Sequence, residues 1–68
     1  MQINIFFERE NKSKKIELNQ NSSVKDLLGK LKINPVTVIA ARDNELITEN
    51  EKLRDNDNIK IIPVVSGG

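Results

Sequence analysis

The stretch SVKDLLGKL, residues 23–31, decides the fold because it alone has the hydrophobic period of a helix. Ser23 is a good N-cap, since its hydroxyl can accept a hydrogen bond from an otherwise unpaired backbone N–H. Asp26, three residues later, forms a shortened capping box with Ser23 and suits the positive end of the helix dipole. We therefore expect one amphipathic helix from Ser23 to Leu31 or Lys32, with these apolar residues on its buried side: Val24, Leu27, Leu28 and Leu31.

Two alternating segments precede the helix and predict a β-hairpin. Residues 2–9 alternate between apolar and polar side chains, with Phe6 as an exception on the polar face. Residues 14–19 alternate in the same way, and the short polar link at residues 10–13 is typical of a hairpin turn. The side chains that we expect to point inward from these strands are Ile3, Ile5, Phe7, Ile16 and Leu18.

Pro35 ends the helix, because the residue before a proline avoids the helical region. Three further strands are expected after it. Residues 36–41 predict the third strand, whose inward side chains are either Val36, Val38 and Ala40, which we favour, or Thr37, Ile39 and Ala41. Residues 46–47 predict a short fourth strand. Residues 59–65 predict a fifth, and their nearly continuous apolar run is typical of a central strand. Leu53 is expected to fill a gap in the core from the preceding loop.

The order of these elements predicts an α+β fold, in which a mixed four- to five-stranded sheet carries one helix on one face. A right-handed crossover through the helix places the first and last strands side by side, parallel and central. This is the β-grasp, or ubiquitin-like, arrangement. We expect one domain over residues 1–65 and a flexible tail at 66–68. The expected core is Ile3, Ile5, Ile16, Leu18, Val24, Leu27, Leu28, Leu31, Val38, Leu53, Ile59 and Ile61.

The composition excludes several kinds of site. The 68 residues include no cysteine and no histidine, so the chain has no disulfide, no thiolate metal site and no histidine-dependent nucleophile. Eleven basic and ten acidic residues give a net charge of +1, which provides no general attraction to nucleic acid. No apolar run is long enough to span a bilayer. We expect a cytoplasmic protein that is a monomer on its own and binds neither nucleic acid nor membrane.

Two charged clusters have plain structural interpretations. Asp55 and Asp57 suggest a calcium loop, but the EF-hand spacing is missing, so we expect a structural turn and no metal. Lys12, Lys14 and Lys15 form a small basic cluster across the hairpin turn, which we interpret as a solvated face.

The last strand runs directly into Ser66-Gly67-Gly68. Together with residues 36–45, the stretch over residues 53–68 resembles the ubiquitin-like sulfur carriers ThiS and MoaD and the small archaeal protein modifiers related to them. The resemblance covers nearly the whole chain. That family usually has Asp-Gly-Asp before its last strand. In this chain Asn56 occupies the position of that glycine, and asparagine also tolerates a left-handed backbone conformation.

The resemblance implies a carrier that is not itself an enzyme. A separate ubiquitin-activating (E1-like) adenylyltransferase would use ATP and magnesium to adenylate the Gly68 carboxylate, so this chain would bind no cofactor. A sulfur donor or sulfurtransferase would then supply a persulfide, which leaves a C-terminal thiocarboxylate. Because Gly67 and Gly68 have no Cβ, the tail can thread a narrow channel. A downstream synthase would take the sulfur for the thiamine thiazole, molybdopterin or tRNA thiolation.

Two other functions stay open at this point. Gly68 could instead form isopeptide bonds with lysines of target proteins, which would make the chain a ubiquitin-like modifier. A plain β-grasp interaction module is the third possibility. For the first two, we expect the activating enzyme to bind the open face of the sheet. The expected contact surface is apolar at Phe6, Ile39, Ile62 and Val64, with Lys60 and Arg42 at its rim.

Overall fold

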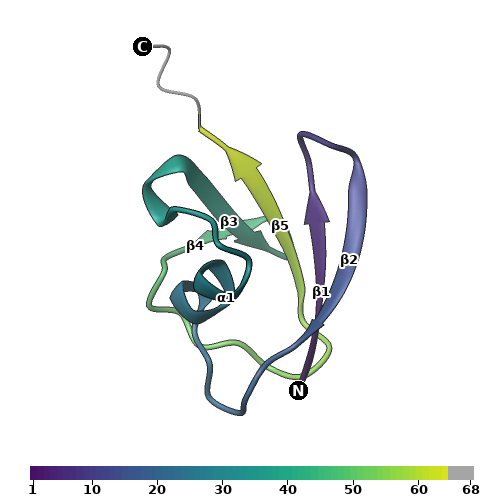
Figure 1. The fold of residues 1–68 in the computed structure, drawn as a ribbon, viewed down its shortest axis with the longest axis vertical. Helices are drawn as coiled ribbons and strands as arrows, with labels where there is room; N and C mark the ends of the chain where they lie inside the picture. The colour runs from purple at the N-terminus through teal and green to yellow at the C-terminus, as the bar shows by residue number, and fades with distance from the viewer. Residues whose placement is uncertain (65–68) are drawn as a thin grey trace.

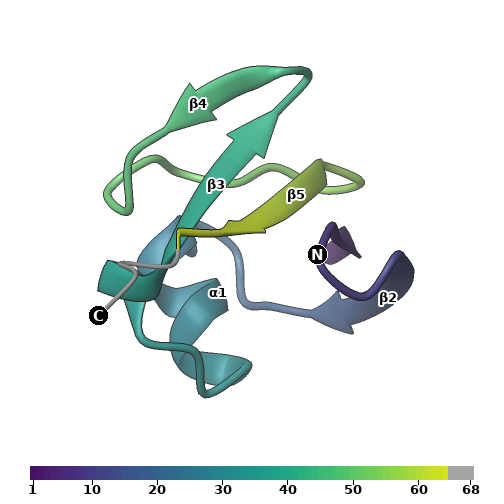
Figure 2. The same ribbon diagram turned by 90° about the horizontal axis from the view of Figure 1, so that it is seen from above.

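The computed structural model describes residues 1–64 and consists of a five-stranded sheet with one α-helix (Figure 1). Residues 65–68 lie outside the described residues, so the expected tail at 66–68 is not tested. The sheet curves around the helix, which covers one face (Figure 2). In chain order the elements are β1 (Gln2–Phe7), β2 (Lys12–Glu17), α1 (Val24–Lys30), the 3₁₀ helix η1 (Pro35–Thr37), β3 (Val38–Arg42), β4 (Glu45–Ile47) and β5 (Asn58–Pro63).

The strand order is β2-β1-β5-β3-β4. Strands β1 and β5 are parallel and adjacent, as predicted, and every other neighbouring pair is antiparallel. Ile5 is paired with Ile59, and Phe7 with Ile61. Because side chains alternate along a strand, this register directs both pairs of the central strands toward the helix. The β-grasp prediction is therefore confirmed.

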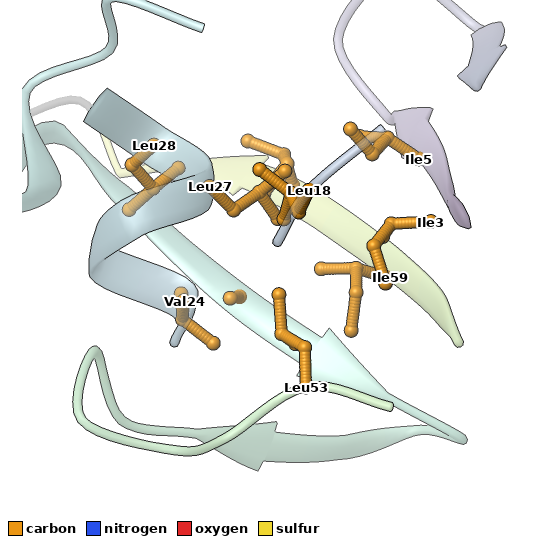
Figure 3. Close-up of a cluster of buried hydrophobic side chains, with 10 residues drawn as sticks. Ile3, Ile5, Leu18, Val24, Leu27, Leu28, Leu53 and Ile59 are labelled. Carbon is orange, nitrogen blue, oxygen red and sulfur yellow. The ribbon is translucent and has the colours of Figure 1, made fainter. Parts of the chain in front are cut away.

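The core lies between the helix and the two central strands (Figure 3). Its buried cluster contains ten residues: Ile3, Ile5, Leu18, Val24, Leu27, Leu28, Ala40, Leu53, Ile59 and Ile61. Ile16, Leu31 and Val38, which we expected in the core, are half-buried and pack against this cluster. The inward position of Val36 is wrong, since this side chain is 80% exposed.

Both helix ends have a complete hydrogen-bonded cap. Ser23 Oγ accepts from the Asp26 N–H, and the Asp26 carboxylate accepts from the Ser23 N–H at 2.9 Å, so the predicted capping box is present. At the other end the Lys32 N–H donates to the Gly29 carbonyl, and the Ile33 N–H donates to the Leu28 carbonyl. These two bonds form a Schellman motif with Lys32 in the left-handed region at φ 60°.

Several strand boundaries differ from the prediction. The hairpin turn lies at residues 8–11, about two residues earlier than expected, because Asn11 adopts the left-handed conformation at φ 52°. Residues 35–37 form η1, since the Asn34 side chain caps this turn and Pro35 fits its first position. Strand β3 therefore begins at Val38. Strand β5 starts one residue earlier than expected and ends at Pro63.

The loop before β5 holds the central pair in place. Leu53 is 4% exposed, so its predicted position in the core is confirmed. Asn56 has a φ of 67°, which confirms that it takes the left-handed conformation of the family's glycine. Its N–H donates to the Gln2 carbonyl at 2.7 Å, which joins the loop to the start of β1. In the described part of the chain, no helix is long and apolar enough to cross a membrane.

The capping box predicts a pH-dependent contribution to stability. Hydrogen bonds from Ser23 lower the pKa of Asp26 below its ordinary value of 3.8. A carboxylate with a lowered folded-state pKa stabilises the protein above that ordinary value, and this stabilisation is lost as the pH falls through the folded-state pKa. We expect Asp26→Ala to lower the urea midpoint at neutral pH and to have little effect in strong acid. An equal loss at both pH values would contradict the cap.

Candidate functional site

The C-terminal end of β5 lies at the opposite end of the molecule from the N-terminus (Figure 1). Val64, the last described residue, remains attached to the domain because its N–H donates to the Thr37 carbonyl at 2.9 Å. Strand β5 is paired with β1 over residues 58–61 and with β3 over residues 59–63. The chain therefore leaves the domain along the pairing with β3, from a strand whose first part is held on both sides. Gly67 and Gly68, the predicted reactive residues, lie outside the described residues.

The face of the sheet opposite the helix collects four of the predicted contact residues. Lys60 of β5 is paired with Phe6 on one side and with Ala41 on the other, and Ile62 is paired with Ile39. Paired residues point to the same face, so these side chains form two adjacent rows. Phe6, Ile39, Lys60 and Ile62 are each half-buried. These four residues therefore lie together across β1, β5 and β3, with Lys60 on the central strand and not at the predicted rim.

Two further apolar residues lie near this group: Val64 just after β5, and Leu46 on β4. Val64, two residues beyond Ile62, is 38% exposed. Leu46 of β4 is paired with Ala41 and is 69% exposed, so it extends the apolar area to the edge of the sheet. We did not predict Leu46 as a contact residue. The available signal was the alternation with Ile47, whose inward position leaves Leu46 pointing out.

The remaining part of the open face is polar. A shallow hollow of about 280 Å³ lies over the β1–β5–β3 region, with Phe6, Ala41 and Lys60 among its lining residues. Ile5 and Ile59 also line it, together with five polar residues: Asn4, Ser13, Asp43, Asn44 and Asn58. An apolar area beside a polar rim is the usual composition of a non-obligate protein interface.

The prediction of Arg42 at the rim of this face is wrong. Arg42 is paired with Ile59, so its side chain leaves the sheet on the helix side. Its guanidinium donates to Glu51 at 2.8 Å and to Asp57 at 3.2 Å. The hydrogen bond with the Glu51 carboxylate raises the pKa of Arg42 further above its already high ordinary value, so the guanidinium stays charged. Arg42 therefore joins the end of β3 to the loop before β5.

The two aspartates of that loop have structural roles, as expected. The Asp55 carboxylate accepts from the Gln2 N–H at 2.7 Å, and the Asp57 carboxylate accepts from the Arg54 N–H at 2.8 Å. Each carboxylate thus satisfies a backbone donor next to the central strands. Within residues 1–64 no group of three acidic side chains is placed to hold a metal ion.

Comparison with known proteins adds the evidence that decides the family. The model of the ThiS family matches residues 3–68. The chain belongs to the ThiS family. Sulfur carrier protein TtuB of Thermus thermophilus is 34% identical to this ThiS-family chain over 55 residues, which are 81% of this chain and 85% of TtuB.

Solved structures agree with the fold of this ThiS-family chain. A putative molybdopterin converting factor subunit 1 from Pyrococcus furiosus has a TM-score of 0.77 at 19% identity, covering 94% of this chain and 98% of its own. The ubiquitin of Caldiarchaeum subterraneum has a TM-score of 0.74 at 19% identity, covering 100% of this chain and 98% of its own. At this level of identity the likeness shows the β-grasp fold alone.

Neighbouring residues of β5 provide a direct test of which face is open. Ile61→Asp would place a carboxylate in the buried cluster, where we expect a loss of roughly 3–5 kcal/mol in the free energy of unfolding. Ile62→Asp would place it on the half-exposed face, where we expect a loss of about 1 kcal/mol. Urea unfolding of both variants measures the difference. Equal losses would show that the assignment of the two faces is wrong.

Proposed function

We propose that this chain is a sulfur carrier whose C-terminal glycine, Gly68, is activated and loaded with sulfur by partner enzymes. The observation that carries the proposal is the family match, which extends to Gly68 and includes the di-glycine. The naming of a 34% identical relative as a sulfur carrier protein supports it. The chain is then a substrate of these reactions and not their catalyst.

The proposed chemistry converts a poor electrophile into a sulfur donor. The Gly68 carboxylate attacks the α-phosphorus of ATP, pyrophosphate leaves, and an acyl-adenylate forms. A persulfide of a sulfur-donor protein attacks the acyl carbon, and AMP leaves. A thiol then reduces the resulting acyl disulfide, which releases the thiocarboxylate together with a new disulfide. The sulfur is attached to the backbone terminus, so the absence of cysteine from the carrier is compatible with this route.

The catalytic groups belong to the partner in this scheme. The chain has no histidine and no cysteine, and the two aspartates of the loop before β5, Asp55 and Asp57, are hydrogen-bonded to backbone donors. We place the ATP and magnesium sites in an adenylyltransferase of the ubiquitin-activating type. Glycine suits the reacting end, because a chain without Cβ atoms can approach a phosphate closely.

The open face of the sheet is the proposed docking surface for that enzyme. Phe6, Ile39, Ile62 and Val64 provide an apolar centre beside the strand that leads to the C-terminus, and Lys60 lies between them. A partner that holds this face has the exit of β5 next to it. Leu46 extends the same area toward β4.

A ubiquitin-like modifier is the second candidate. The likeness to a protein named ubiquitin, with a TM-score of 0.74, favours it. Both candidates need the same adenylation of Gly68. They differ in the nucleophile that finally attacks: a persulfide in sulfur transfer, and a lysine amine of a target protein in conjugation.

Intact-mass measurement tests the proposal. The protein is incubated with its adenylyltransferase, ATP, magnesium, a persulfide-bearing sulfurtransferase and a reducing thiol. We expect the mass to rise by the difference between sulfur and oxygen, and removal of Gly68 to abolish the change without affecting thermal unfolding. Adducts on lysines of other proteins would establish the modifier instead. A loaded protein after removal of Gly68, or no adenylation of the intact chain, would contradict both.

The same assay tests the docking surface. Ile62→Asp is expected to raise the carrier concentration needed for half-maximal adenylation by roughly tenfold or more, because it places a charge in the apolar centre. Gln20→Asp is the matched control, since it introduces the same charge at an exposed loop residue away from the sheet face. An equal response of the two variants would exclude the open face as the docking surface.

A further inference from the structure

Two lysines of the edge strand β2 occupy the face of the sheet that carries the core. Lys14 is paired with Ile5, and Lys12 with Phe7, and directly paired residues point to the same face. Ile5 is buried, whereas both lysines are exposed. Lysine commonly protects an edge strand against pairing with another chain. That purpose alone does not require apolar surface beside the lysines.

Such apolar surface is present in a groove between the β1–β2 hairpin and the segment after α1. The groove has a volume of about 420 Å³. Three half-buried apolar side chains line it: Phe7, Leu31 and Ile33. Lys12 and Lys14 line it as well, together with Glu10 and Ser13. A partner side chain could cover the apolar residues while its neighbours meet the lysine amines.

Positive charge is concentrated in the chain segment that contributes Lys12, Lys14 and Leu31 to the groove. Residues 9–32 include seven basic and three acidic residues, whereas residues 33–64 include four basic and six acidic residues. Within residues 1–64 neither Lys12 nor Lys14 is paired with a carboxylate, and the same is true of Lys32, which stands between two lining residues. An acidic partner can therefore meet these amines without breaking an internal ion pair.

We propose that this groove is a second interaction site, which binds an acidic segment of a partner protein through one apolar anchor residue. The anchor covers Phe7, Leu31 and Ile33, and acidic residues beside it pair with Lys12 and Lys14. Burial of the anchor supplies affinity, and the charges set orientation and association rate. Nucleic acid suits the groove less well, because bases stack on several aromatic rings and this groove has one.

The groove lies on the helix side of the sheet, whereas the face proposed for the activating enzyme lies on the other, and Ser13 of the edge strand lines both hollows. A second partner in the groove would therefore contact the carrier next to the activating enzyme while the C-terminus is being loaded. This consequence depends on the proposed function, but the groove itself does not. An acidic segment would bind the free protein whether or not Gly68 is ever adenylated.

A peptide titration followed by NMR tests the site. The probe is a short Asp/Glu-rich peptide with a central Leu-Phe pair, added to isotope-labelled protein. We expect the amide signals of Phe7, Lys12, Lys14, Leu31 and Ile33 to move, and those of the open face to stay. A peptide with lysine at the acidic positions, or with Ala-Ala in place of Leu-Phe, is expected to leave the groove signals unchanged.

Charge reversal provides the matched comparison. The double variant Lys12→Glu/Lys14→Glu is expected to weaken peptide binding by roughly tenfold or more. Lys15→Glu is the control, because Lys15 is paired with Asn4 and points to the other face, and it should weaken binding far less. All three positions are exposed, so thermal unfolding should not change.

Three results would overturn the proposal. The first is the absence of signal changes at the groove. The second is a Lys15→Glu variant that loses half or more of the binding free energy lost by the double variant, because a loss in proportion to the number of reversed charges would indicate general charge attraction. The third is an RNA oligonucleotide that shifts the groove signals more strongly than the acidic peptide does, which would assign the groove to a different class of partner.

Discussion

The parallel pairing of β1 with β5 is the contact on which the rest of the structure depends. It joins the first and last strands of the chain, which are separated by more than fifty residues in sequence, through the pairs Ile5–Ile59 and Phe7–Ile61. The hairpin, the helix and β3 all pack on this pair or extend it. Loop closure of this length costs entropy that only core burial can offset. Two backbone links from Gln2, to Asn56 and to Asp55, fix the register where the pair begins.

This arrangement separates two faces with different tasks. One face is covered by α1 and holds the buried cluster, and the other presents the half-buried row of Ile39 and Ile62 to solvent. Because β5 is paired with β3 up to Pro63 and the Val64 N–H donates to the Thr37 carbonyl, the exit of the chain has a fixed position relative to both faces. A partner bound to either face would therefore find the end of β5 in a defined place. The lysine-framed groove adds a third surface at the hairpin.

Much of this was predictable from the sequence, because local chemistry and global fold agree. The helix from the Ser23 cap to Leu31 and the central parallel pair followed from period, capping and connection rules, and the left-handed Asn56 followed from the resemblance to the sulfur-carrier family. The errors arose where the sequence does not show which alternate side chains of a strand point inward. Residues 36–41 do not alternate between apolar and polar side chains, so the sequence did not indicate η1 or the exposed position of Val36.

Other features depend on partners that are distant in sequence. Arg42 is charged, as residues at the rim of an interface usually are. Only the strand pairing shows that its side chain points to the helix side, where it forms ion pairs with Glu51 and Asp57. The groove beside Lys12 and Lys14 likewise requires the helix end to lie near the hairpin. Lys32 closes the helix in a conformation for which glycine is usual, and no sequence rule indicates that.

Native-state hydrogen exchange measures the central claim most directly. If the β1–β5 pair holds the domain together, the interior amides of β5, which lies between β1 and β3, exchange only through global unfolding. Their exchange free energies should then equal the free energy of unfolding from urea, while those of β4 and the hairpin turn should be lower. Amides of β5 that exchange as readily as those of β4 would contradict the account.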